Sequence, residues 1–238
     1  MNATPVRVLI HGSTGRMGRA LLRLCDEQPE RFAVVAAVSR QPGQRVVDGV
    51  PQFGARELSG VPAFDVLVDF SQPEAFDRAL ALAVARKTGF VSGTTGLTDA
   101  QREALVEAAG QVPACWASNF SLGVAVLARL VRQAGQALAG WDCDIIETHH
   151  AGKVDAPSGT ALTLGAAAGA GGAEPRYASL RAGDIVGEHV VQFTGIGERI
   201  ELVHRATSRD IFARGALHAA ARLPGREPGL YRVDDLLG

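Results

Sequence analysis

The sequence predicts an α/β protein: an N-terminal Rossmann-type parallel sheet, and a second, smaller α+β domain that contains a mixed sheet. Three observations support this fold class. In the first half, short apolar runs alternate with helical patterns, which is typical of strands joined by crossover helices. A glycine loop at residues 12–18 lies between the first apolar run and the first helical pattern. After residue 120 the pattern changes, and two of the later strands alternate apolar and polar residues.

Each element of the first half follows from its own pattern. Short apolar runs predict buried strands at residues 6–10, 32–38, 65–70, 90–92 and 113–117. Helical spacing of apolar residues predicts helices at residues 16–26, 73–86 and 98–110. Thr98 and Gln101 have the spacing of a capping box, which places the start of the third helix.

The second half contains longer elements. Helical spacing predicts helices at residues 122–139, 162–173 and 211–222. Strands are expected at residues 144–148, 185–194 and 199–206. We therefore predict a dinucleotide-binding domain of residues 1–119, completed by residues 209–238. Residues 120–208 are expected to form a substrate-binding and oligomerisation domain.

Composition and charge narrow the class of protein. The 238 residues carry 24 Lys+Arg against 25 Asp+Glu, and this balance argues against nucleic acid or an anionic membrane as the main partner. The three cysteines are widely spaced, without a C-x-x-C pair, so neither a disulfide framework nor a zinc site is expected. No signal peptide and no apolar segment of about 20 residues are recognised. We expect a cytoplasmic protein.

The glycine loop has the features of a dinucleotide-binding turn. A pyrophosphate needs backbone N–H groups at a helix N-terminus, and residues without a Cβ let it come close. The spacing here is G-x-x-G-x-x-G, at Gly12, Gly15 and Gly18, rather than the common G-x-G-x-x-G. A turn that only packs the helix is the alternative, but its place between a strand and a helix favours dinucleotide binding.

Ser39 and Arg40 follow the second predicted strand, at the position where dinucleotide-binding folds contact the adenosine ribose of the cofactor. An acidic residue there would accept hydrogen bonds from the ribose 2′-OH and repel a 2′-phosphate. The Ser-Arg pair carries no negative charge and offers a cation to a 2′-phosphate. We therefore predict that NADPH is used at least as well as NADH. The alternative for Arg40 is a solvated surface side chain.

Residues 149–160 contain the largest cluster of candidate catalytic and substrate-binding residues in the chain. His149, His150 and Lys153 place two imidazoles and an ammonium within five residues, directly after a predicted strand. Residues 157–160 then read as a helix start, whose backbone N–H groups can hold a carboxylate. Such a cluster suits an anionic substrate that must be both bound and protonated. Metal binding by the two histidines is the alternative, but no companion Cys or carboxylate pattern supports it, so no metal is predicted.

With these motifs the sequence resembles the 4-hydroxy-tetrahydrodipicolinate reductase (dihydrodipicolinate reductase) family. The resemblance rests on the glycine loop and on His-His-x-x-Lys-x-Asp-x-Pro-Ser-Gly-Thr at residues 149–160. Further matching stretches span nearly the whole chain in order, at residues 69–74, 93–96, 118–123 and 181–189.

The resemblance implies reduction by NADPH or NADH of a small dicarboxylate in the diaminopimelate route of lysine biosynthesis. It implies that His149 and Lys153 donate the proton. Substrate carboxylates would be bound by His150, Lys153, Ser158, Gly159 and Thr160. Cofactor-binding residues would be Gly12, Ser13, Thr14, Gly15, Arg16, Met17, Ser39, Arg40, Gly93, Thr94, Thr95, Ala117, Ser118, Asn119 and Phe120.

Two departures from the family pattern are visible. Many members carry an acidic residue where this chain has Ser39, and the stretch between Ala173 and Arg181 is shorter than is usual in the family. A homotetramer is expected from the resemblance alone. Two other functions remain as alternatives: another small NAD(P)-dependent dehydrogenase, of the aspartate or semialdehyde type, and a non-catalytic dinucleotide sensor.

Overall fold

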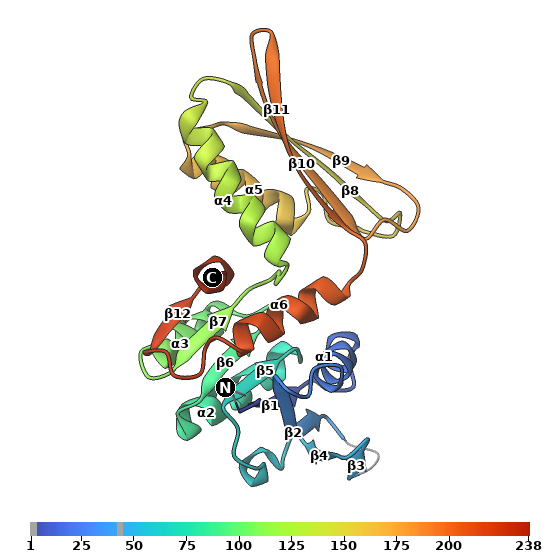
Figure 1. The fold of residues 1–238 in the computed structure, drawn as a ribbon, viewed down its shortest axis with the longest axis vertical. Coiled ribbons are helices and arrows are strands. Elements are labelled where there is room, and N and C mark those ends of the chain that lie inside the picture. Colours follow the sequence, from blue (N-terminus) through green and yellow to red (C-terminus); the bar gives the residue numbers. More distant parts are fainter. Residues whose placement is uncertain (1–3, 42–44) are drawn as a thin grey trace. The chain divides into compact units, whose positions relative to one another are not determined.

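The computed structural model describes residues 4–41 and 45–238. Residues 1–3 lie outside the described residues. They belong to the N-terminal segment in which no signal peptide is recognised from the sequence. The chain divides into two compact units (Figure 1). Unit 1 comprises the residues up to Phe120 together with Phe212–Gly238, and unit 2 comprises Ser121–Ile211. Among the described residues, none of the helices combines the length and the apolar character needed to span a membrane.

Unit 1 is built on a sheet with the order β12-β7-β6-β5-β1-β2-β4-β3, in which all neighbours except β3 and β4 run parallel. The parallel Rossmann-type sheet is thereby confirmed. Its central strands are short and almost fully apolar, as strands covered on both faces must be. The strands are β1 (Val6–His11), β2 (Phe32–Ser39), β3 (Val46–Val47), β4 (Val50–Gly54), β5 (Val66–Asp69), β6 (Gly89–Ser92), β7 (Pro113–Trp116) and β12 (Gly229–Tyr231).

Helices cover both faces of this sheet (Figure 1). On one face, α2 (Pro73–Arg86) and α3 (Asp99–Ala109) share a buried core with alternate residues of the strands. The other face carries α1 (Arg16–Asp26) and α6 (Asp210–Ala220). The capping box that opens α3 is present, with Gln101 N–H donating to Thr98 Oγ1 and Thr98 N–H donating to Gln101 Oε1. Two short 3₁₀ turns, Leu58–Gly60 and Val233–Leu236, complete the unit.

Unit 2 is a four-stranded mixed sheet with the order β11-β10-β8-β9, as the sequence predicts for the smaller domain. β8 (Asp142–His149) pairs antiparallel with β10 (Gly187–Gly195) and parallel with β9 (Pro175–Arg181), and β10 pairs antiparallel with β11 (Glu198–Ala206). The helices α4 (Leu122–Ala137) and α5 (Gly159–Ala170) lie side by side on one face (Figure 1).

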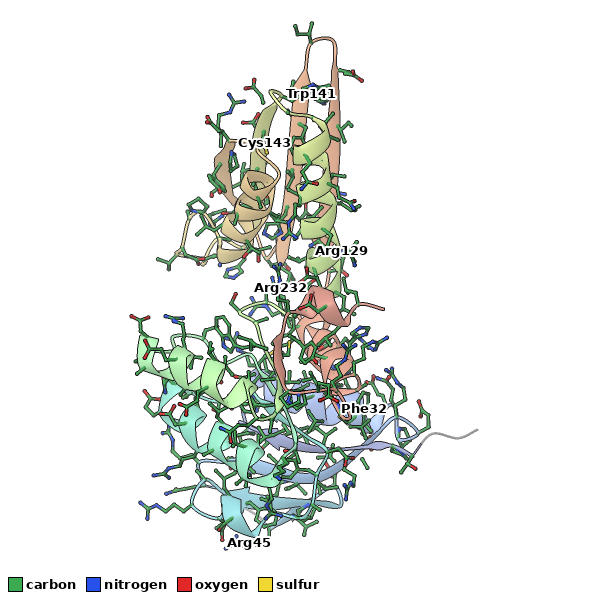
Figure 2. All side chains as sticks on the ribbon, turned by 90° about the vertical axis from the view of Figure 1, so that its left-hand side faces the viewer. Phe32, Arg45, Arg129, Trp141, Cys143 and Arg232 are labelled. Carbon is green, nitrogen blue, oxygen red and sulfur yellow. The ribbon has the colours of Figure 1, made fainter. Side chains whose placement is uncertain are left out.

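The core of unit 2 lies between these two helices and the sheet. Phe193, Ile145 and Leu164 are fully buried there, and Trp141 packs at its edge. Trp141 and Cys143 are labelled in Figure 2, on the segment where α4 gives way to β8. Burial of these large apolar side chains holds the end of β8, and the residues that follow it, in a fixed place.

Several elements differ from the sequence predictions. Strands β3, β4, β9 and β12 are additional, and they are either short or poor in buried apolar residues. Helix α5 begins at Gly159, three residues before the start given by apolar spacing at Leu162, and in agreement with the helix start predicted at residues 157–160. The segment between Ala173 and Arg181 is largely strand β9, so the shortened stretch still contributes an edge of the sheet.

Candidate active site

The glycine loop of unit 1 joins the end of β1 to the start of α1. Gly12 N–H and Ser13 N–H both donate to the Val38 carbonyl, at 2.9 and 3.0 Å, which ties the loop to the neighbouring strand β2. Gly15 is the N-cap of α1, and among the described residues no side chain caps this helix end. The N–H groups of the first turn are therefore available to an anion, as in other dinucleotide sites.

Two glycines of the loop are required by close backbone approaches. Gly12 has a positive φ of 82°, and a Cβ there would lie 2.4 Å from the Phe70 carbonyl oxygen. A Cβ on Gly18 would lie 2.2 Å from the Gly12 carbonyl oxygen. Any larger residue at either position would push the loop away from β5 or from α1. The spacing Gly12–Gly15–Gly18 thus reflects packing of the helix onto the strand as well as an open helix end.

A cleft of about 540 Å³ opens beside this loop at the carboxyl ends of the strands. This edge is where doubly wound sheets bind their ligands. Of the predicted cofactor-binding residues, five line the cleft: Gly12, Thr14, Gly15, Ser39 and Arg40. Helix α2 contributes Glu74, Ala75 and Arg78 to the lining, and the sequence reasoning assigned none of the three a role.

Ser39 and Arg40 lie where the second strand ends, as the sequence predicts. Ser39 is buried, and its hydroxyl has no hydrogen-bond partner among the described residues. Arg40 is exposed at the rim of the cleft. A buried hydroxyl without a partner is uncommon in a folded protein, and at a cleft wall it indicates a group that a ligand completes.

His11 lines the cleft and belongs to a buried hydrogen-bond network that the sequence reasoning missed. His11 Nδ1 lies 2.8 Å from Asp69 Oδ1, and Asp69 also accepts from Thr94 Oγ1 at 2.7 Å and from Ser92 Oγ at 2.9 Å. Burial opposes ionisation of Asp69, but the hydrogen bonds from His11 and the hydroxyls outweigh it and hold its pKa below the ordinary value. The network fixes the carboxyl ends of β1, β5 and β6 relative to one another.

The remaining predicted cofactor residues follow β6 and β7. A Cβ on Gly93 would lie 2.1 Å from the Phe70 ring, so this glycine lets the loop pass over the ring. Phe70 in turn packs against Phe120, with ring centroids 5.8 Å apart. Thr95 and Ser118 are exposed and Thr94 is buried. None of the following lines the cleft described above: Ser13, Arg16, Met17, Gly93, Thr94, Thr95, Ala117, Ser118, Asn119 and Phe120.

In unit 2, His149 is the last residue of β8 and is largely buried. Its Nδ1 is hydrogen-bonded to the carboxylate of Glu147, two residues earlier on the same face of the strand. Burial lowers the pKa of His149, Glu147 acts in the opposite direction, and the charges of Lys153 and Arg181 add to the lowering. The Glu147 carboxylate therefore favours the protonated imidazolium form of His149, whereas burial and the neighbouring cations favour the neutral form.

Lys153 lies in the loop between β8 and α5. Its Nζ is 2.7 Å from Asp155 Oδ1, and the side chain is 22% exposed, so the ammonium is reachable while most of the stem is covered. The loop is closed by a hydrogen bond from Lys153 N–H to the His150 carbonyl at 3.1 Å. His150 is half-buried at the start of the same loop.

Ser158 caps α5, as the Pro-Ser-Gly-Thr sequence predicts. Its hydroxyl accepts from Ala161 N–H at 3.2 Å, and Gly159 and Thr160 form the first turn of the helix. The partial positive charge of this helix end suits a carboxylate. The structure thus brings His149, Lys153 and the start of α5 together within unit 2, in the segment that sequence analysis singled out.

Glu147 and Arg181 are the site residues of unit 2 to which sequence reasoning assigned no role. Arg181 Nη2 lies 2.8 Å from Glu147 Oε1. Burial opposes ionisation of Glu147, yet hydrogen bonds from Arg181, Ser179 and His149 lower its pKa to about 2. The only sequence signal was the place of Glu147 two residues before His149, on the same face of a strand.

Comparison with known families gives a consistent result over both units. A family model described as "Dihydrodipicolinate reductase, N-terminus" matches residues 6–120, and one described as "Dihydrodipicolinate reductase, C-terminus" matches residues 123–237. The two matches together span nearly the whole chain.

Curated relatives are similar over their full length. A protein named 4-hydroxy-tetrahydrodipicolinate reductase from Stenotrophomonas maltophilia (strain R551-3) is 71% identical, and the alignment covers 100% of both chains. Proteins of the same name from Xanthomonas campestris pv. campestris (strain B100) and Xylella fastidiosa (strain 9a5c) are 67% and 62% identical, covering 100% and 98% of both chains.

Solved structures share the fold. Dipicolinate-bound dihydrodipicolinate reductase from Paenisporosarcina sp. TG-14 superimposes with a TM-score of 0.83 at 22% identity, covering 96% of this chain and 97% of that one. A diaminopimelate (DAP) dehydrogenase from C. glutamicum, in complex with DAP, has a TM-score of 0.63 at 17% identity, covering 99% and 96%.

Proposed function

The chain belongs to the dihydrodipicolinate reductase family, and from this premise we propose which of its residues perform each part of the reaction. It is an NAD(P)H-dependent oxidoreductase that reduces 4-hydroxy-tetrahydrodipicolinate to tetrahydrodipicolinate in the diaminopimelate route of lysine biosynthesis. The observation that carries the residue assignments is the coincidence of that family match with a proton-donating cluster at His149 and Lys153.

The cofactor is a nicotinamide dinucleotide, and we assign its pyrophosphate to the glycine loop, residues 12–17. Two features fit a dinucleotide: the N-terminus of α1 has no side-chain cap, and the Ser39 hydroxyl at the cleft wall has no partner among the described residues. When bound, the cofactor supplies the hydride. The chain's own part here is to orient the dinucleotide through backbone N–H groups.

We further propose that NADPH is used at least as well as NADH. The support is chemical: Ser39 and the guanidinium of Arg40 line the cleft at the end of β2. The two arginines of the lining, Arg40 and Arg78, outnumber the one carboxylate among the described lining residues, Glu74. Guanidinium groups pair with phosphate through parallel hydrogen bonds, whereas no acidic residue follows β2 to repel a 2′-phosphate.

The remaining cofactor residues, Gly93, Thr94, Thr95 and 117–120, are proposed for the nicotinamide side. Their support is the family resemblance and their place after β6 and β7, at the same edge of the sheet as the glycine loop.

For the substrate we propose that the carboxylates of a small dicarboxylate are bound by His150, Lys153, Ser158, Gly159 and Thr160. The start of α5 offers backbone N–H groups and Lys153 offers an ammonium. The two structural neighbours were solved with dipicolinate and with DAP, which are ligands of this class.

The proton is assigned to His149 and Lys153. The reaction adds one hydride, takes up one proton and releases the 4-hydroxyl as water. Negative charge that develops on the substrate must be neutralised nearby, and a positioned acid provides a factor of about 10²–10⁴. In this assignment His149 acts through Nε2, the ring nitrogen that is not bonded to Glu147, and Lys153 acts through Nζ.

We also propose a cytoplasmic location and a homotetrameric assembly. The three cysteines are free and buried, which suits a reducing cytoplasm. A homotetramer is proposed from the family resemblance, and exposed apolar side chains at Leu180, Ile200 and Val203 give the unit 2 sheet a surface for it. Light scattering measures the assembly directly.

The experiment that tests the function is a coupled assay. Dihydrodipicolinate synthase generates the substrate in place, and oxidation of NADPH or NADH is followed by absorbance. The account predicts turnover with both cofactors, dependent on the synthase and its substrates. Binding of NADPH without any turnover would instead identify a dinucleotide sensor.

A further inference from the structure

We propose that Glu147 and Arg181 are positioning residues for the two proton donors: Glu147 holds the ring of His149, and Arg181 holds the loop that carries Lys153. The proposal rests on the proposed function, since it presumes that His149 and Lys153 deliver the proton. It adds two residues that touch neither the substrate nor the cofactor in that scheme.

Glu147 is a fully buried carboxylate that is hydrogen-bonded to three residues of the site. It accepts from His149 Nδ1, from Arg181 Nη2 at 2.8 Å, and from the backbone N–H of Ser158 at 3.3 Å. A buried charge is destabilising unless it is fully paired. Glu147 therefore joins the end of β8, strand β9 and the cap of α5 through one group.

The hydrogen bond to Nδ1 determines which ring nitrogen of His149 exchanges a proton. With Nδ1–H donated to Glu147, the other nitrogen, Nε2, faces away from the carboxylate. Gly187 at the start of β10 leaves room for that edge, because a Cβ there would lie 3.0 Å from Nε2. The ring of His189 packs edge-on at 5.3 Å. His149 is thus held on three sides.

Arg181 holds the loop between β8 and α5 in place, as Glu147 holds the ring of His149. Its guanidinium donates to the Lys153 carbonyl at 3.2 Å, to the Asp155 carbonyl at 2.6 Å, and to Glu147 Oε1 at 2.8 Å. The two carbonyls bracket Val154, so the backbone next to Lys153 is fixed. Only a planar fork with several N–H groups can reach these acceptors at once, which a lysine cannot do.

Another ion pair on the same two strands provides a matched control. Arg176 on β9 donates to Asp144 on β8 at 2.8 and 2.9 Å, and so joins the same two strands as the Arg181–Glu147 pair. It lies at the other end of β9, and its side chains are 59% and 31% exposed. A change there tests the cost of disturbing the β8–β9 pairing without touching the loop or His149.

The first test is a double-mutant cycle. Glu147→Gln keeps the size of the side chain and removes its charge, and we expect kcat to fall about 10- to 100-fold, the usual scale for a residue that orients a functional ligand. In a His149→Ala background the same change should cost little more, because its target is gone. An equal loss in both backgrounds would overturn the role of Glu147.

The second test uses Arg181→Lys against Arg176→Lys. We expect Arg181→Lys to lower kcat about tenfold, with the KM for NADPH unchanged, and to add little in a Lys153→Ala background. Arg176→Lys should leave both parameters within about twofold of the parent. Equal losses in the two lysine variants would show a general effect of the strand pairing and would overturn the role of Arg181.

A spectroscopic test separates this proposal from the proposed function. Nitrogen NMR of His149 reports its titration, with Glu147, Arg181, Lys153 and His189 as the charged or titratable groups that face it. In Glu147→Gln the midpoint should fall, because the carboxylate that favours the imidazolium is lost. An unchanged midpoint would refute the contact. This result is independent of turnover, whereas near-normal turnover in His149→Ala and Lys153→Ala would refute the assignment of the proton donors and leave the contact between Glu147 and His149 standing.

Discussion

The two units present sites of opposite construction. In unit 1 the glycine loop beside the cleft is shaped by backbone and by missing side chains: at Gly12 and at Gly18 a Cβ would lie within 2.4 Å of a carbonyl oxygen. In unit 2 the site consists of charged side chains, and the buried carboxylate of Glu147 connects His149 with Arg181. One site depends on the path of the chain and the other on a set of paired charges.

This difference indicates which substitutions should abolish the function of each site. A backbone cradle tolerates exchange of its exposed side chains but not the addition of a methyl group at a close approach. A charge network tolerates little change of charge, even at constant volume, because a buried partner is then left unpaired. Variants of the two units should therefore separate cofactor binding from chemistry.

The largest effect is expected for the proton donors. Lys153→Ala and His149→Ala should each lower kcat about 10²–10⁴-fold, since general acid assistance has that magnitude. Steady-state kinetics with the coupled substrate supply measure it. Near-normal turnover in both variants would refute their assignment.

Acid should affect unit 2 through His189. Burial, together with the neighbouring His149 and His204, lowers the pKa of His189 to about 4 from 6.5. The unfolded chain then binds more protons between these two values, so stability is full above about pH 6.5 and is lost as pH falls to about 4, by up to about 3 kcal/mol. Urea unfolding at a series of pH values measures this loss, and His189→Gln should reduce the dependence of the free energy of unfolding on pH. An equally steep loss in that variant would contradict the origin in His189.

A methyl group should be enough to disturb the unit 1 site. Gly18→Ala places a Cβ 2.2 Å from the Gly12 carbonyl oxygen, and we expect it to lower stability by about 2 kcal/mol and to weaken NADPH binding. Gly60→Ala is the matched control, because a Cβ there has nothing within 4 Å. Thermal unfolding with and without NADPH compares them. Equal behaviour of the two variants would argue against the close approach.

The smallest effect concerns the ribose end of the cleft. Arg40→Ala should weaken NADPH binding about tenfold, the value of one good charged contact, and leave NADH nearly unchanged. Titration with the two cofactors measures the difference. A parallel loss for both would assign Arg40 to a role other than the 2′-phosphate.

The parts of the fold that were predicted are those with a local signal. The strands of unit 1 are apolar runs between helical patterns, and Thr98 and Ser158 mark helix starts by their own side chains. Strand β9 has no such signal, because most of its residues are exposed and it is held by main-chain pairing to β8. Strand β4 contains Pro51 and Gly54, which disfavour a strand prediction.

The same distinction holds for the site. Spacing along the chain was enough to predict the glycine loop and the cluster from His149 to Thr160. Glu147 and Arg181 are separated by 34 residues, and their contact appears only when β9 pairs with β8. Asp69 and His11 are likewise joined only by the pairing of β1 with β5. Contacts made by strand pairing leave no pattern in the sequence.

The central claim is that cofactor binding resides in unit 1 and proton delivery in unit 2. Its most direct test is the dissociation constant of NADPH for the double variant His149→Ala/Lys153→Ala, measured by fluorescence titration. The account predicts a value within about twofold of the parent, because neither change touches the glycine loop. A weakening of about tenfold or more would show that the unit 2 cluster helps to hold the cofactor, and would contradict the division.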